Sequence, residues 1–163
     1  MLLTQIANAR DLAVETVPVP VSIGYFPSSH DSVAGLTEVR ASGPRPDLNG
    51  TRCKFSNRPH IYLIDNGYRR HIPDPTTYNN LFRDWEGVVV DNDIDEIPEA
   101  RAIQSGAILA KGHATPQVYL IDQGQKRHIV SPDVMEKFHF AWGRIYVVPQ
   151  ILIDAIPTGQ PIT

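Results

Sequence analysis

The sequence has little cysteine and no long apolar stretch. Cys53 is the only cysteine among the 163 residues, which excludes an intramolecular disulfide and a zinc site built from cysteine alone. We expect it to be a small buried hydrophobe. No stretch approaches the roughly 18 apolar residues of a membrane-spanning helix. Residues 1–11 lack the basic start and continuous apolar core of a secretory signal, so we expect a cytoplasmic protein or one exported without a leader.

An excess of positive charge is missing as well. Lys and Arg number 15 against 18 Asp and Glu, which gives a formal net charge of −3. Phosphate backbones are bound by clustered Lys and Arg, so nucleic acid is not an expected partner. Hydrophobic residues make up 42%, enough for a buried core, while 14 prolines and 11 glycines favour short elements and many turns.

What the sequence does contain is an internal repeat. The stretch Tyr62–Ile72 recurs 57 positions later as Tyr119–Ile129, and the register holds without a gap from 59–90 to 116–147. We interpret residues 50–105 as repeat 1 and residues 106–163 as repeat 2, the two forming one domain. Residues 1–49 have no counterpart and are interpreted as an N-terminal arm or linker.

Each repeat predicts a β-hairpin, a short helix and a closing strand. Asn66-Gly67 and Gln123-Gly124 lie between β-branched runs and predict two-residue turns. Asp74 and Ser131 each precede a proline and predict a capped helix start. The sequence therefore predicts an α+β protein of two tandem repeats packed on each other, with an extended N-terminal arm. The apolar residues of each predicted helix keep the spacing of one helical face and end in a tryptophan, and we expect these two residues, Trp85 and Trp142, to lie in a shared core.

The arm predicts a helix over 4–14 and, from its alternating prolines, an extended segment over 17–21. Such a segment adds readily to a sheet edge of its own domain or of a neighbour. This favours an interaction or assembly role, including self-association into an oligomer.

The repeat resembles one that occurs in tandem in bacterial secreted and surface-associated proteins. Its pattern is Val/Ile-Tyr-Leu-Ile-Asp-x-Gly-x-Arg/Lys-Arg-His-Ile, a proline-led short helix ending in Trp, and Ile-Pro-x-Gly. The resemblance spans Gly50 to Gly159. In such proteins the copies often stand beside wall-associated or hydrolase domains, which implies a role at the cell envelope but no established ligand.

The duplicated hairpin carries the candidate site residues. A two-residue turn places Tyr62 opposite His71, with Asp65 and Arg70 as diagonal neighbours on the other face. This arrangement fits two interpretations, a structural brace or a duplicated ligand pocket. The pocket interpretation takes as ligand-binding residues Tyr62, Tyr68, Arg70, His71, Tyr119, Arg127 and His128.

Catalytic and metal motifs are weak. Histidine is a natural acid/base near neutral pH, but no nucleophile motif accompanies His71 or His128, so we lean against an enzyme. The run 91–96 opens like a calcium loop, with Asp91, Asp93 and Asp95 as weak candidate ligands, and then departs from the pattern. We expect a solvated acidic loop and no cofactor.

These patterns favour three functions. The first is a non-catalytic, lectin-like binding module for a glycan or cell-envelope polymer. The second is a protein-interaction or assembly module that uses the N-terminal arm. The third is a small acid/base enzyme that uses the duplicated Tyr-His pairs.

Overall fold

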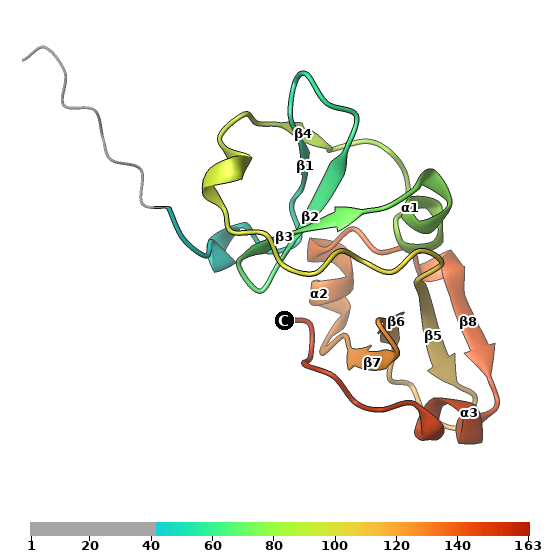
Figure 1. The fold of residues 1–163 in the computed structure, drawn as a ribbon. Helices are drawn as coiled ribbons and strands as arrows, with labels where there is room; N and C mark the ends of the chain where they lie inside the picture. The colour runs from blue at the N-terminus through green and yellow to red at the C-terminus, as the bar shows by residue number, and fades with distance from the viewer. Residues whose placement is uncertain (1–41) are drawn as a thin grey trace, which may run out of the picture. The chain divides into compact units, whose positions relative to one another are not determined.

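A computed structural model describes residues 42–163 of the chain. These residues form two four-stranded sheets and three α-helices, which confirms the α+β class (Figure 1). Within the described range no helix has the length and apolar content to span a bilayer. The predicted helix over 4–14 and the extended segment over 17–21 lie outside the described residues.

The two sheets have the same strand order. The first sheet, in the order β3-β2-β1-β4, consists of β1 (Arg52–Lys54), β2 (Ile61–Asp65), β3 (Tyr68–Ile72) and β4 (Val89–Val90). The second, in the order β7-β6-β5-β8, consists of β5 (Ile108–Gly112), β6 (Tyr119–Asp122), β7 (Gln125–His128) and β8 (Ile145–Val148). In each sheet the last strand pairs in parallel with the first, and the other pairs are antiparallel.

Both predicted hairpins are present with the predicted register. Asn66 and Gln123 each have a φ of 53°, and the glycine that follows each also has a positive φ. Two consecutive residues with positive φ define the turn that matches the twist of the flanking strands. Tyr62 therefore pairs with His71, and Tyr119 with His128.

Short helices follow the hairpins. The α-helices are α1 (Pro75–Leu81), α2 (Pro132–Lys137) and α3 (Gln150–Ala155), and the 3₁₀ turns are η1 (Pro46–Leu48), η2 (Ile94–Glu96) and η3 (Trp142–Arg144). The predicted caps are confirmed, because Asp74 accepts a bond from the Thr77 N–H at 2.7 Å and Ser131 from the Val134 N–H at 3.2 Å. The sequence did not predict α3, which follows β8.

The main core takes side chains from both repeats. Leu63 and Phe82 from repeat 1 lie in one buried cluster with Leu120 and Phe140 from repeat 2. The rings of Phe82 and Phe140 stack with centroids 5.7 Å apart, and the two residues form an antiparallel bridge. Each repeat thus buries apolar area that it could not cover by itself.

The tryptophan prediction is wrong. Trp85 is 48% exposed and Trp142 is 45% exposed, so neither lies in the core. The helix that was expected to carry Trp85 ends at Leu81, where Phe82 becomes extended, and the helical spacing stops there. An indole N–H also needs a hydrogen-bond partner, and both indoles find theirs near the surface.

A smaller cluster lies on the other face of the first sheet. It contains Cys53, which is buried as expected, and Leu48 packs against it. The Arg45 N–H donates to the Gly67 carbonyl at 2.8 Å, and the Gly50 N–H to the Ile64 carbonyl at 2.8 Å. Residues 42–49, which the sequence assigns to the arm, are therefore attached to the first hairpin.

Candidate functional site

Two equivalent clefts lie at the start of the two helices. The repeat-1 cleft, about 230 Å³, is lined by residues 59–61 and 71–75 together with Tyr78 and Trp85. The repeat-2 cleft, about 420 Å³, is lined by residues 116–118 and 128–132 together with Met135 and Trp142. Every lining residue of one cleft has its counterpart in the other, 57 positions away. The sequence repeat is therefore also a repeat of a surface cleft.

A fixed indole forms one wall of the repeat-1 cleft. The Trp85 ring stacks on the Tyr78 ring with centroids 4.0 Å apart and planes 19° from parallel. The Trp85 Nε1 donates to the Asn79 Oδ1 at 2.9 Å. One face and the polar edge of the indole are therefore held, while about half of the side chain remains exposed.

The repeat-2 cleft holds its indole in a similar way. The Trp142 Nε1 donates to the Glu136 Oε1 at 2.7 Å, and Glu136 is the counterpart of Asn79. The pKa of the Glu136 carboxyl lies below its usual range, because the Trp142 N–H and the Arg83 guanidinium both bond its charged form. Met135 takes the place of Tyr78 in the lining of this cleft.

A histidine from the hairpin lines each cleft. The His71 ring lies 5.6 Å from the Tyr62 ring and 5.1 Å from the His60 ring, measured between centroids. Burial, and then the neighbouring His60, lower the pKa of His71, so it is neutral at pH 7 with one donor and one acceptor nitrogen. His128 lies 5.6 Å from Tyr119 in the same manner. Neither imidazole makes a hydrogen bond within residues 42–163.

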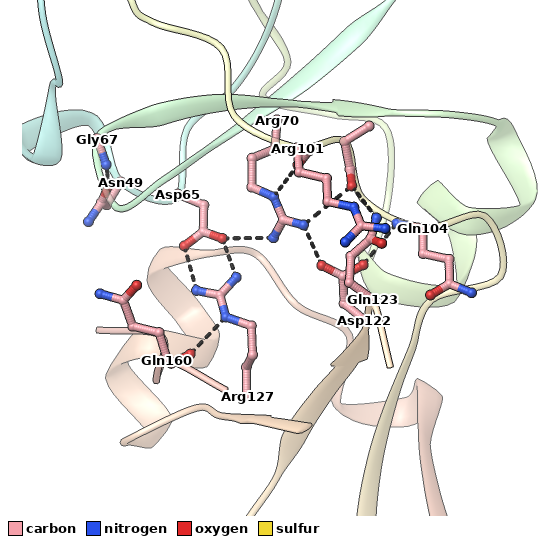
Figure 2. Close-up of polar contacts among 11 residues, drawn as sticks. Asn49, Asp65, Gly67, Arg70, Arg101, Gln104, Asp122, Gln123, Arg127 and Gln160 are labelled. Carbon is pink, nitrogen blue, oxygen red and sulfur yellow. Dashed lines mark hydrogen bonds and ion pairs between the residues drawn. The ribbon is translucent and has the colours of Figure 1, made fainter. Parts of the chain in front are cut away.

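A third cleft, of about 350 Å³, lies where the tips of the two hairpins meet, and we call it the junction cleft. Its floor is a network of buried ion pairs (Figure 2). Asp65 accepts hydrogen bonds from Arg70 of its own hairpin at 3.0 Å and from both terminal nitrogens of Arg127. Asp122 pairs with Arg70 and accepts the Gln104 N–H at 2.8 Å.

The charges of this network balance within the protein. Burial by itself raises the pKa of Asp65, but the bonds and charges of Arg127 and Arg70 outweigh it and lower the pKa overall. Two carboxylates and two guanidiniums leave no net charge on the network. Buried ion pairs persist only with such full compensation, so these four side chains are fixed structural elements of the cleft floor.

The structure distributes the predicted ligand-binding residues over three places. His71 lines the repeat-1 cleft and His128 the repeat-2 cleft, whereas the junction cleft receives Tyr68, Arg70 and Arg127. Tyr62 and Tyr119 lie beside the histidines and line none of the three clefts. The predicted brace between Asp65 and Arg70 is present.

Sequence reasoning missed the two tryptophans and the ion pairs between repeats. The indoles were assigned to the core because they continue the helical spacing, although each follows the end of its helix. The cross-repeat pairs had a signal, since the same Asp and Arg occur on the same face of both hairpins. Nothing in the sequence, however, indicates that these two faces meet.

The acidic loop does not gather its side chains around a common point. Asp91 Oδ1 accepts the Asp93 N–H at 2.9 Å, which closes a local turn. Within the part of the chain that the structure describes, no three Asp, Glu, His or Cys side chains form a group that could hold a metal ion. The geometry therefore gives the weak calcium candidates Asp91, Asp93 and Asp95 no support.

Comparisons with protein-family models, with curated proteins and with solved structures found no match to this chain. The clefts and their residues therefore carry the functional interpretation.

Proposed function

We propose that the chain is a non-catalytic binding module that takes a glycan, of the kind found in cell-envelope polymers, in its repeat-1 and repeat-2 clefts. The observation that carries this proposal is the duplicated cleft with a half-exposed, fixed indole beside a histidine. Ligand sites combine apolar and aromatic walls with a few placed polar groups, and both clefts have this composition.

The chemistry of a sugar ring fits such a wall. A pyranose presents an apolar face of C–H groups and a rim of hydroxyls, so it stacks on a flat aromatic ring and hydrogen-bonds at its edge. Trp85 and Trp142 offer the ring, and both are already held by hydrogen bonds at the indole N–H. Little side-chain freedom is lost when a ligand lands on them, which favours binding.

The imidazoles supply the polar edge. A neutral His71 can donate to one hydroxyl and accept from another, and it makes no competing bond in the described chain. No carboxylate bonds to His71 or His128 there to orient the ring for proton transfer. This geometry supports recognition over acid/base catalysis.

Duplication gives such a module avidity. Two shallow sites that bind one polymer hold it more tightly than either site alone. The sites are not identical, because His60 and Tyr78 of the first cleft are replaced by Gln117 and Met135 in the second. We therefore expect both clefts to bind the same class of ligand with different affinities.

A glycan array that includes peptidoglycan fragments, probed with the full chain, tests the proposal. We expect a specific hit, followed by a change of tryptophan fluorescence on titration. The double variant Trp85→Ala/Trp142→Ala should lose binding, and so should His71→Ala/His128→Ala if it remains folded. Tyr146→Ala removes an aromatic that is 54% exposed and lies outside both clefts, and serves as the control.

Two outcomes would contradict the proposal. One is binding that survives unchanged in the folded tryptophan double variant. The other is that the protein binds no glycan on the array, which would move the search to a protein partner of the N-terminal arm.

A further inference from the structure

We propose that the junction cleft is a separate binding site for a small ligand that carries one carboxylate and several hydroxyls, such as a uronic acid unit. This inference does not rest on the two tryptophan clefts. The side chains that line the junction cleft come from the hairpin tips and from the segments that follow β4 and α3. The proposal rests on the charge, the asymmetry and the size of this cleft.

The cleft has one cationic group that no described residue compensates. Both buried carboxylates are engaged, Asp65 by Arg70 and Arg127, and Asp122 by Arg70 and the Gln104 N–H. Arg101 also lines the cleft and is exposed, and its guanidinium makes no hydrogen bond or ion pair within residues 42–163. The lining therefore has a net positive charge that an anionic ligand would neutralise.

The backbone of Arg101 is fixed, although its side chain bonds to none of the residues that the structure describes. The Arg101 carbonyl accepts a bond from Arg70 Nε at 2.9 Å. The Gln160 carbonyl accepts the equivalent bond from Arg127 Nε at 2.8 Å. Arg101 and Gln160 are thus counterparts, one held by each buried arginine, and both side chains line the cleft.

This pairing makes the two halves of the cleft chemically different. The half that repeat 1 lines has Tyr68 and Arg101, and the half that repeat 2 lines has Gln125 and Gln160. In Figure 2, Arg101 lies on the Asp122 side of the network and Gln160 on the Asp65 side. A ligand that places a carboxylate at Arg101 and neutral hydroxyls at the glutamine amides satisfies both halves.

The donor inventory also favours an anion. A guanidinium has five N–H groups, and the bonds of Arg127 to Asp65 and to the Gln160 carbonyl use three of them. The Tyr68 hydroxyl and the Gln125 and Gln160 amides make no hydrogen bond in the described part of the chain. The described lining of the cleft thus offers many donors and no uncompensated carboxylate.

Size restricts the ligand to one small unit. The volume of about 350 Å³ lies at the lower end of ligand pockets, which span roughly 300–1,000 Å³. A single acidic sugar ring suits this volume better than a protein segment does. A chain terminus of a uronic acid polymer would present the same group.

Titration of the full chain with glucuronate, followed by calorimetry or by NMR, tests the site. Glucose and the methyl ester of glucuronic acid serve as neutral ligands of similar shape. We expect both to bind about ten-fold more weakly or worse, because each lacks the charged partner of Arg101. Arg101→Gln should remove the preference for the charged form, and Arg101→Lys should keep part of it.

Matched variants separate this site from the tryptophan clefts. Arg144→Gln removes an exposed arginine elsewhere on the surface and should leave glucuronate binding unchanged. Trp85→Ala/Trp142→Ala should also leave glucuronate binding unchanged. The test of the junction cleft is therefore independent of the test of the tryptophan clefts, and either proposal can fail without the other. A short uronic acid oligomer shows whether the ligand is a free sugar acid or the end of a polymer. Binding of glucuronate or of the oligomer supports the site, and the one that binds more tightly indicates the natural ligand.

Any one of the following outcomes would overturn the inference. They are no detectable glucuronate binding at millimolar concentration, equal binding of glucuronate and its methyl ester, and binding that Arg101→Gln leaves intact. Loss of glucuronate binding in the tryptophan double variant alone would also overturn it, because the ligand would then occupy the other clefts.

Discussion

Asp65 and Arg127 lie in different repeats and form a buried, two-pronged ion pair in which each carboxylate oxygen accepts from a guanidinium nitrogen (Figure 2). The Oδ1 branch measures 3.0 Å. Arg70 makes the complementary contact to Asp122. Because each buried carboxylate needs an arginine from the other hairpin, the network is complete only when the two hairpin tips are aligned. The ion pairs thereby fix the floor of the junction cleft.

Asp65→Asn should be strongly destabilising. The variant keeps the shape of the side chain and removes the charge that Arg70 and Arg127 share, so two buried guanidiniums lose their common partner. Breaking a buried pair in this way costs about 3–5 kcal/mol of the free energy of unfolding. Urea unfolding followed by circular dichroism measures the change.

Glu99→Gln is the matched control for that substitution. Glu99 pairs with Arg69 at 3.5 Å, but its side chain is 50% exposed. Exposed pairs contribute about 0–1 kcal/mol, so this variant should unfold almost like the parent. Similar losses of unfolding free energy in Asp65→Asn and Glu99→Gln would show that the buried network contributes no more to stability than an exposed ion pair.

Acid should destabilise the protein partly through Asp65. Its pKa in the folded state is lower than its ordinary value of 3.8, because the two arginines outweigh the effect of burial. The unfolded chain therefore binds a proton before the folded one does. The stabilisation is fully present well above pH 3.8 and is lost as the pH falls through that value toward the folded pKa.

Unfolding free energies measured between pH 7 and pH 2 check this expectation. The parent should lose stability more steeply below about pH 4 than Asp65→Asn, which has no carboxyl at this position. Parallel curves for the two proteins would mean that other carboxyls account for the acid sensitivity.

Local structure was predictable because local chemistry determines it. The turn residues Asn66 and Gly67, the caps Asp74 and Ser131, and the pairing of Tyr62 with His71 all depend on neighbours a few positions away. The duplication strengthened each prediction, since two copies indicated the same element. Helix α3 was not predicted, because Pro149 supplies no side-chain cap to mark its start.

Contacts between the repeats were not predictable from the pattern. Periodicity shows which residues share a face of one hairpin, but it does not show which face meets the other hairpin. The pairs Asp65–Arg127 and Arg70–Asp122 depend on that choice. The exposed indoles of Trp85 and Trp142 depend on where each helix ends, and boundaries are poorly defined by spacing alone.

Removing the two helix caps should have unequal effects. Ser131→Ala deletes one bond, to the Val134 N–H, and should cost about 1 kcal/mol. Asp74 caps α1 and also accepts bonds from the Thr77 and Ser105 hydroxyls, so Asp74→Ala should cost more. Thermal unfolding of both variants gives the comparison. A smaller loss for Asp74→Ala than for Ser131→Ala would mean that the added bonds contribute nothing.

The thiol of Cys53 should be unreactive in the folded protein. Its side chain is 2% exposed, and burial raises its pKa to about 12. At pH 8 only about one thiol in 10⁴ would then be ionised, whereas an unfolded cysteine has a pKa of about 8.5 and reacts readily as the thiolate. Reaction with a thiol-specific disulfide reagent should therefore be slow in buffer and complete within minutes in denaturing urea.

The slow rate of Cys53 labelling should rise in Asp65→Asn, because a less stable fold exposes the thiol more often by transient unfolding. Rapid labelling of the parent protein in buffer would contradict the burial of this residue.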